Sequence, residues 1–232
     1  MVSRAFIVGL LAGALLLSVA LPAAGDSPPT VSSYYTGRAD PRLCPSPMCG
    51  GLWVKLVNRP ATACGDATRR EECYVAATDL TRLPVDEKSR VQLQAAITEG
   101  RALARGALVR GQVEGFPELD TLVVSEVWVA SSSRNRATGV FHTLRDRGIR
   151  CIAAPCFNTH AAALNSGAHA NVSAVDLSRS GAPAGERRSA LQHLPHVGLI
   201  TAGRIVADRS AGRKRVGRKV VASQFYVRAD IG

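Results

Sequence analysis

The sequence predicts a mainly β fold in which two related domains each carry one helix. Four blocks of residues recur in the same order along the chain, which indicates an internal repeat. Short runs rich in β-branched and aromatic residues alternate with turn residues, as in small β domains. Six cysteines, two pairs of them in C-x4-C spacing, suit loops that are stapled by disulfides.

The N-terminal segment is typical of a signal peptide. Arg4 precedes an apolar run from Ala5 to Ala20, and the small residues of Leu21–Gly25 follow it. This run has 16 residues, fewer than the roughly 20 that a membrane-spanning helix needs. We expect cleavage after Gly25, so that residues 1–25 are the signal peptide. The mature chain is then exported to the periplasm or the medium and has no membrane span.

The repeat is clearest between Tyr34–Asn58 and Phe141–Asn165, which align without gaps and match both C-x4-C pairs. The other blocks pair Asp79–Thr81 with Asp176–Ser178, Gly111–Val113 with Gly203–Ile205, and Val123–Val129 with Val221–Val227. We predict repeat one, a cysteine-stapled β-rich domain, at residues 26–130, and repeat two, a β-rich domain with a basic hairpin loop, at 140–232. The Ser- and Arg-rich residues 131–139 are expected to form an exposed linker.

Repeat one is expected to contain five strands and one helix. The strands are expected at Tyr34–Arg38, Leu52–Val57, Cys73–Leu80, Ala102–Val113 and Leu122–Ala130. Between the third and fourth strands, Asp86 can cap a helix over Glu87–Glu99 that Gly100 ends. The apolar face of that helix is expected to include Val91 and Ala95, with Leu93, Ala96 and Ile97 as further candidates.

Repeat two follows the same plan. Its strands are expected at Val140–Leu144, Thr159–Leu164, Val172–Leu177, Gly198–Ala207 and Val220–Arg228, and its helix at Glu186–Leu194. Three strands, a helix and two strands form the element order of the oligonucleotide/oligosaccharide-binding (OB) barrel. Two tandem OB-like small barrels, related by internal duplication, are therefore the expected architecture. The alternative is a pair of related α+β sheets.

The cysteines are expected to pair within each repeat, because an exported chain meets an oxidising compartment. Repeat two has one pair, which predicts a Cys151–Cys156 bridge, and the repeat then predicts Cys44–Cys49 and leaves Cys64–Cys73. A competing interpretation is a zinc site made by the four thiolates of repeat one. Thiolates outside the cytoplasm normally oxidise first, so we expect disulfides and no metal.

Several runs together resemble a known family. They are Arg38–Asn58, Cys73–Ala76, Leu108–Gly111, Leu122–Trp128 and Arg150–Cys156. In combination they resemble an uncharacterised family of exported bacterial proteins, designated a domain of unknown function, with C-x4-C motifs. The resemblance covers nearly all of the mature chain. It implies export and disulfide use, and it implies no activity.

The net charge of +11 is concentrated in the second half of the chain. Residues 26–130 hold 12 basic and 13 acidic side chains, whereas residues 131–232 hold 16 basic and 5 acidic ones. Six cations fall within residues 209–219, namely Arg209, Arg213, Lys214, Arg215, Arg218 and Lys219. We predict that they form an exposed hairpin loop that binds a polyanion. A solvated loop without function is the competing interpretation.

Motifs of common enzyme classes are absent from the sequence. It has no phosphate-binding Gly-rich loop, no Gly-x-Ser-x-Gly elbow and no His-Glu-x-x-His helix. The histidine pairs His193/His196 and His160/His169 lack a third ligand. We therefore predict a non-enzymatic protein with no catalytic residue, no metal and no cofactor. The strand aromatics Trp53, Tyr74, Trp128 and Tyr226 are expected to be core residues rather than a stacking surface for bases or sugars.

These features together predict an exported binding or envelope-associated protein that engages a polyanion through its basic loop. The expected partner is an anionic polymer or the envelope surface, while nucleic acid is a candidate that no motif supports. The alternative is a secreted inhibitor of a protease or another enzyme. A stapled loop such as Cys44–Cys49 is rigid, so it could insert into a target at low entropic cost.

Overall fold

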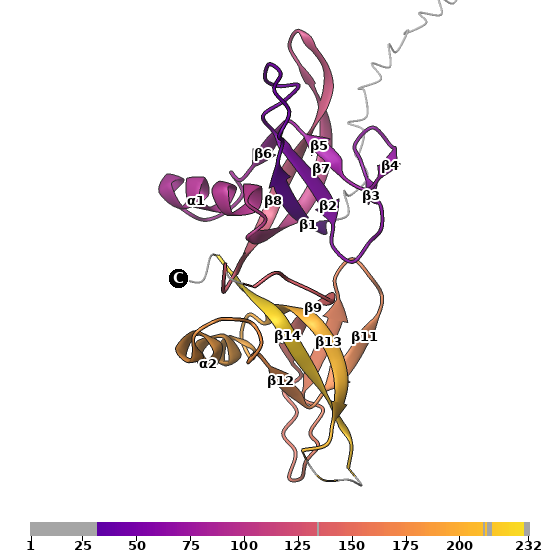
Figure 1. Cartoon of the computed structure of the whole chain (residues 1–232), viewed down its shortest axis with the longest axis vertical. Helices are drawn as coiled ribbons and strands as arrows, with labels where there is room; N and C mark the ends of the chain where they lie inside the picture. The colour runs from indigo at the N-terminus through magenta and orange to yellow at the C-terminus, as the bar shows by residue number, and fades with distance from the viewer. Residues whose placement is uncertain (1–31, 134, 211, 213–214, 230–232) are drawn as a thin grey trace, which may run out of the picture.

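The computed structural model describes residues 32–133, 135–210, 212 and 215–229. The predicted signal peptide at 1–25 lies outside the described residues, as do Arg213 and Lys214 of the basic loop. The described chain forms two halves that are stacked along the long axis of the molecule (Figure 1).

The two halves contain similar elements in similar order. The first half has β1 (Ser33–Ala39), β2 (Leu52–Leu56), β3 (Thr62–Ala63), β4 (Arg69–Arg70), β5 (Cys73–Val75), β6 (Ala77–Asp79), α1 (Glu87–Thr98), β7 (Ala102–Val113) and β8 (Phe116–Ala130). The second half has β9 (Val140–Asp146), β10 (Thr159–Ala163), β11 (His169–Val172), β12 (Ala174–Asp176), α2 (Ala184–His193), β13 (Leu199–Asp208) and β14 (Gly217–Arg228). The predicted mainly β fold with one helix per half is confirmed.

Twelve strands form one sheet that runs through both halves. Its order is β5-β2-β1-β7-β8-β14-β13-β9-β10-β11, with β6 beside β8 and β12 beside β14. The pairing is antiparallel except for the β6·β8 and β12·β14 pairs, which are parallel. The halves therefore share one continuous sheet rather than forming two independent ones, and tandem barrels stay a prediction.

The expected third strand of each half is broken into two short strands. In the first half β5 pairs with β2, whereas β6 pairs with β8 on the other side. The break falls at Ala76, whose N–H donates to the carbonyl of Asp120 on β8 at 2.8 Å. Ser173 separates β11 from β12 in the same way and donates to the carbonyl of Arg218 at 2.7 Å. The strand breaks because it changes partner there.

One block of the predicted repeat is shifted by five residues. Gly106 lies opposite Val124 at a β-bulge, and Gly203 lies opposite Ala222 at another. A Cβ at either glycine would come within 2.2 Å of a carbonyl oxygen on the facing strand. Gly111, which we expected to match Gly203, has open space around its Cα instead. That expectation was wrong, because Gly106 makes the close backbone approach that Gly203 makes.

Helix α1 begins as predicted, since the Asp86 carboxylate accepts a hydrogen bond from the Ser89 N–H at 2.7 Å. Its buried residues are Leu93, Ala96 and Ile97. Val91 is 62% exposed, so its expected place on the apolar face was wrong. Helix α2 follows Pro183 without a side-chain cap and buries only Ala190. No helix in the described part of the chain is long and apolar enough to cross a membrane.

A shared core joins the two halves. Its buried residues are Val57, Leu103, Trp128, Leu164, Ile200, Ala202 and Tyr226, drawn from both halves. Trp128 and Tyr226 are 2% and 4% exposed, as expected for core aromatics. Beside this core β8 and β14 pair with Val129 opposite Val227, and these two residues are equivalent in the repeat alignment. The junction therefore has the same pairing when viewed from either half.

The segment expected to be an exposed linker is partly buried and tied to β14. Ser131 Oγ donates to Gln224 Oε1 at 2.8 Å, and Gln224 Nε2 donates to the carbonyl of Ser132 at 2.6 Å. The N–H of Thr138 donates to Ser223 Oγ at 2.9 Å. These contacts anchor the described linker residues, because β14 passes beside them where the halves meet.

Candidate functional site

The loop between β13 and β14 is shorter than predicted. Pairing of Ala207 with Arg218 and of Val206 with Lys219 continues the ladder, so both cations lie on β14 rather than in the loop. Arg209, Arg215 and Arg218 are exposed, and Lys219 is half-buried. Arg213 and Lys214 lie outside the described residues.

Lys219 differs from the described cations of the loop because its charge acts on two carboxyl groups of the protein. The pKa of Asp208 is lowered chiefly by hydrogen bonds from Ser210, and the nearby Lys219 charge lowers it further. The pKa of Asp176 is lowered chiefly by hydrogen bonds from Ser178, again with help from Lys219. The Lys219 charge thus interacts with two carboxylates of the protein, although it forms no ion pair with a described carboxylate.

The basic loop packs against the loop stapled by Cys151–Cys156. Arg215 Nη1 lies 3.5 Å from the carbonyl of Ala154, and a Cβ on Gly217 would meet the Pro155 side chain at 3.0 Å. Both loops lie at the lower end of the molecule in Figure 1. The stapled loop adds two exposed cations that sequence reasoning missed, Arg147 and Arg150. We call the surface formed by Arg147, Arg150, Arg209, Arg215 and Arg218 the basic tip.

All three predicted disulfides are present. The Cα–Cα distances are 5.4 Å for Cys44–Cys49, 5.5 Å for Cys64–Cys73 and 5.6 Å for Cys151–Cys156, which suit bridged cysteines. The connectivity predicted from the repeat is therefore confirmed. The four cysteines of the competing zinc interpretation form the Cys44–Cys49 and Cys64–Cys73 disulfides. Each C-x4-C bridge closes a loop at one end of the molecule (Figure 1).

Ion pairing is distributed very unevenly between the halves. Among the described residues, nine of ten ion pairs join side chains of the first half, and only Arg150–Asp146 lies in the second. No described carboxylate pairs with Arg209, Arg215 or Arg218. Arg209, Arg215 and Arg218 are therefore exposed without an ion-pair partner among the described carboxylates, whereas eight of the twelve cations of the first half are ion-paired.

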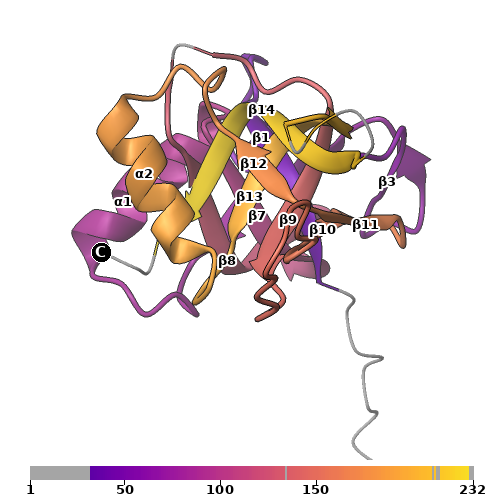
Figure 2. The ribbon, with the colours of Figure 1, turned by 90° about the horizontal axis from the view of Figure 1, so that it is seen from below.

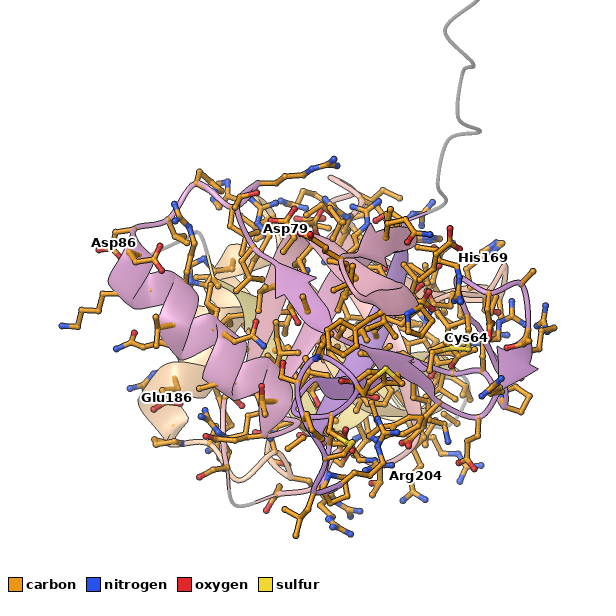
Figure 3. All side chains as sticks on the ribbon, turned by 90° about the horizontal axis from the view of Figure 1, so that it is seen from above. Cys64, Asp79, Asp86, His169, Glu186 and Arg204 are labelled. Carbon is orange, nitrogen blue, oxygen red and sulfur yellow. A yellow bond between two sulfur atoms is a disulfide. The ribbon has the colours of Figure 1, made fainter. Side chains whose placement is uncertain are left out.

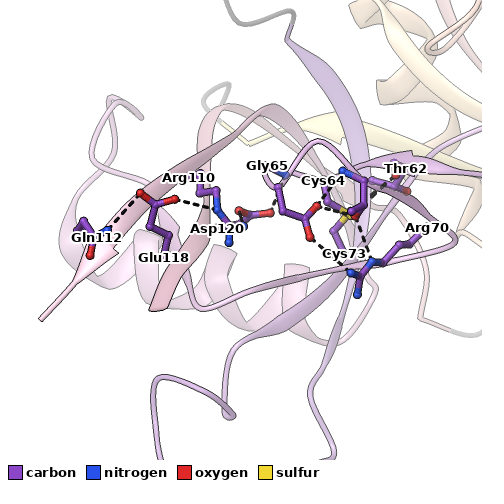
Figure 4. Close-up of polar contacts among 11 residues, drawn as sticks. Thr62, Cys64, Gly65, Arg70, Cys73, Arg110, Gln112, Glu118 and Asp120 are labelled. Carbon is purple, nitrogen blue, oxygen red and sulfur yellow. Dashed lines mark hydrogen bonds and ion pairs between the residues drawn. A yellow bond between two sulfur atoms is a disulfide. The ribbon is translucent and has the colours of Figure 1, made fainter. Parts of the chain in front are cut away.

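The corresponding end of the first half shows the contrast. There Arg110 on β7 pairs with Glu118 at 3.2 Å and with Asp120 at 3.1 Å, both on β8 (Figure 4). Asp120 is 5% exposed and also accepts a hydrogen bond from the N–H of Gly65 at 2.7 Å. Asp120 thus ties this hairpin to the Cys64–Cys73 loop, while Glu118 pairs within the hairpin.

An arginine–aromatic cluster supports the loop closed by Cys44–Cys49, which we call the first stapled loop. The Arg42 guanidinium lies 5.1 Å from the Trp53 ring and 4.6 Å from the Tyr74 ring, within the range of cation–π contacts. Tyr74 Oη donates to the carbonyl of Pro47 at 2.7 Å, and Arg42 Nη2 donates to the carbonyl of Met48 at 2.9 Å. Trp53 and Tyr74 are therefore half-buried supports of the loop rather than the core residues we expected.

A family model matches residues 33–230, which includes both halves and all six cysteines. The chain belongs to the family DUF6748, a domain of unknown function. This membership confirms the resemblance seen in the C-x4-C motifs. No curated protein and no solved structure matches the chain.

Among the described residues of the DUF6748 domain, no group of three or more His, Cys, Asp or Glu side chains could hold a metal ion. The rings of His160 and His169 lie 5.5 Å apart, and no third ligand accompanies them in the described chain. A pocket of about 280 Å³ beside α2 is lined by Glu186, His193 and Phe225, among others. Figure 3 shows Glu186 and His169 on opposite sides of the molecule, so these groups cannot act together.

Proposed function

We propose that this protein is an exported, non-enzymatic binding protein whose basic tip engages a polyanion. The observation that carries the proposal is the set of exposed guanidinium groups at one end of the molecule, to which no described carboxylate pairs apart from Asp146 at Arg150. Cations without an internal partner can bind phosphate or sulfate groups and release the counterions of a polyanion.

We propose further that each half is an OB-like unit and that the two halves arose by duplication. The strand pairs support this. In the first half β1 pairs with β2 and β2 pairs with β5, and the chain continues from β5 through Ala76 into β6. Strand β6 pairs with β8, β8 pairs with β7, and β7 pairs with β1, where the series began. The second half has the corresponding pairs in the same order. In OB barrels the loops between strands 1 and 2 and between strands 4 and 5 bind ligands. In the second half those loops correspond to the loop closed by Cys151–Cys156 and to the basic loop between β13 and β14.

Export by a signal peptide completes the proposal. Three disulfides and the lack of a free cysteine in the described chain suit an oxidising compartment. We place the mature protein in the periplasm or the medium, where polyanions of the cell envelope are available to the basic tip.

Retention on heparin tests the proposed function. We expect a variant with Arg209, Arg215 and Arg218 replaced by Ser to elute at clearly lower salt than the parent. A matched control replaces Arg69, Arg82 and Lys88 by Ser, because these exposed cations lie in the first half and their loss changes the net charge equally. Equal elution of the two variants would show that only net charge matters, and the basic tip would then have no role.

Inhibition of another enzyme remains a second candidate function, favoured by the rigidity of the first stapled loop. Leu43, next to Cys44, is 101% exposed while the loop behind it is fixed by Tyr74 and Arg42. Such a preorganised side chain could enter a pocket of a target enzyme with little loss of entropy. Salt separates the two candidates, because polyanion binding weakens steeply with salt and insertion of an apolar side chain does not.

A further inference from the structure

The basic tip also carries exposed aliphatic side chains. Ile152 is 109% exposed, and Ile149 and Val216 are exposed as well. Ile149 and Ile152 belong to the stapled loop, and Val216 belongs to the basic loop that packs against it. The three side chains therefore gather at the end of the molecule where the unpaired cations lie.

The loop that carries Ile149 and Ile152 is anchored at its base and closed by a disulfide. The Cys151–Cys156 disulfide closes the loop, and Arg147 fastens its base by a hydrogen bond from Nη1 to the carbonyl of Phe157 at 2.7 Å. The N–H of Arg147 also donates to the carbonyl of Asn158 at 2.8 Å. The loop therefore cannot easily fold Ile152 back onto the protein, and the side chain stays available to a partner.

Charge and apolar surface alternate along both loops. Arg150 stands between Ile149 and Ile152 in the sequence, and Val216 follows Arg215. A membrane surface of anionic lipids matches this alternation, because it offers phosphate groups to arginines and an acyl layer just beneath them to aliphatic side chains. A soluble polysaccharide or a nucleic acid duplex offers charge without an accessible apolar layer. The aliphatic residues therefore favour the lipid surface over other polyanions.

We propose that the basic tip docks on an anionic membrane surface, with Ile149, Ile152 and Val216 inserted past the lipid headgroups into the upper part of the acyl layer. This inference rests on the proposed function and names its partner. The orientation also suits the charges of the whole molecule, because the hairpin with Glu118 and Asp120 lies at the opposite end (Figure 1). Docking through the basic tip keeps these carboxylates far from the anionic surface.

Cosedimentation with vesicles tests the proposal. The parent is expected to bind phosphatidylcholine vesicles that contain phosphatidylglycerol and not pure phosphatidylcholine vesicles. Replacing Ile149, Ile152 and Val216 by Ser should weaken vesicle binding at least about tenfold while heparin retention stays unchanged. The matched control replaces Leu43, Met48 and Val109 by Ser, since these are exposed apolar residues of the first half. It should bind both materials as the parent does.

The outcomes separate this inference from the function on which it rests. Parent protein that is retained on heparin but does not bind the anionic vesicles would overturn membrane docking and leave polyanion binding intact. Parent protein that binds neither would overturn both. Equal vesicle binding by the parent and by the Ile149, Ile152 and Val216 variant would show that no side chain inserts.

Insertion has a direct optical readout that does not depend on affinity. The Ile152→Trp variant places an indole at the tip, whereas the native Trp128 is buried and Trp53 lies in the first half. Lipids brominated in their acyl chains should quench the added fluorescence. Fluorescence unaffected by the brominated lipid in vesicle-bound protein would contradict insertion.

Discussion

Asn58 and Asn165 form reciprocal contacts between the two halves of the molecule. The Asn58 amide donates to the carbonyls of Phe141 at 2.8 Å and Leu164 at 3.1 Å, and its oxygen accepts from the N–H of Phe141 at 2.9 Å. Both asparagines have a left-handed backbone, with φ of 58° and 53°. They occupy equivalent places in the repeat alignment.

Asn165 makes the corresponding three bonds in the other direction. Its amide donates to the carbonyls of Tyr34 at 2.7 Å and Val57 at 3.0 Å, and its oxygen accepts from the N–H of Tyr34 at 2.9 Å. Contacts in which each half offers the same groups to the other are typical of two-fold symmetric dimers. The two halves of this chain therefore meet as the subunits of such a dimer do.

We predict that Asn58→Ala and Asn165→Ala each lower the free energy of unfolding by about 2–4 kcal/mol, because each leaves backbone groups unsatisfied and strains a left-handed residue. Urea denaturation measures the change. The Gly variants serve as matched controls, since glycine tolerates the positive φ and loses only the hydrogen bonds. A loss below about 1 kcal/mol in both Ala variants would mean that water replaces the amides.

The bulge glycines can be tested against Gly111. Gly106→Ala and Gly203→Ala should each destabilise the protein by about 2 kcal/mol or more, because the new Cβ would collide with a carbonyl oxygen on the facing strand. Gly111→Ala should change stability by less than about 0.5 kcal/mol, since its surroundings are open. Thermal unfolding of the three variants measures these differences. If the Gly111 variant were as unstable as the other two, the reason for matching Gly106 rather than Gly111 with Gly203 would be lost.

Acid should weaken the support of the first stapled loop. Hydrogen bonds from the Arg42 guanidinium lower the pKa of the Asp40 carboxyl from its ordinary 3.8, and Trp53 adds a further hydrogen bond. A lowered folded-state pKa means that Asp40 contributes its full stability above the ordinary value. That contribution is lost as the pH falls below 3.8 toward the lower pKa of the folded state. Asp40→Asn should therefore show a smaller loss of stability than the parent between neutral pH and pH near 3. Parallel pH profiles of the two proteins would contradict this account.

Arg218 and Lys219 should contribute unequally to polyanion binding although they are neighbours. Each phosphate contact that is lost reduces the log–log salt slope by about 0.9 for duplex DNA. We expect Arg218→Ser to reduce the slope by about this amount, and Lys219→Ser to reduce it less, because the half-buried Lys219 already interacts with the carboxylates of Asp176 and Asp208. Binding measured at several salt concentrations gives both slopes. A larger effect at Lys219 would show that its carboxylates turn away when the ligand binds.

The predictions made from local sequence patterns were the most reliable ones. The Asp86 cap, the start of α1 and most strand positions depend on residues that are close in sequence, and the structure has them where they were predicted. The loop between β7 and β8 was predicted too long, because β8 begins at Phe116 and Pro117 lies within the strand. Val91 was placed on the wrong face, since the packed face of α1 is defined by contacts with the sheet that its own periodicity did not reveal.

The sequence by itself determined the disulfide pairing and the mainly β element order, because both follow from cysteine spacing and from short-range patterns of side chains. Only the tertiary structure decided how the two halves join and which cations stay unpaired. Tyr34 meets Asn165 across 131 positions, and no local pattern reports a contact of that range. Which cations form ion pairs could not be predicted from the sequence for the same reason, since an ion pair depends on the distance between two side chains in space.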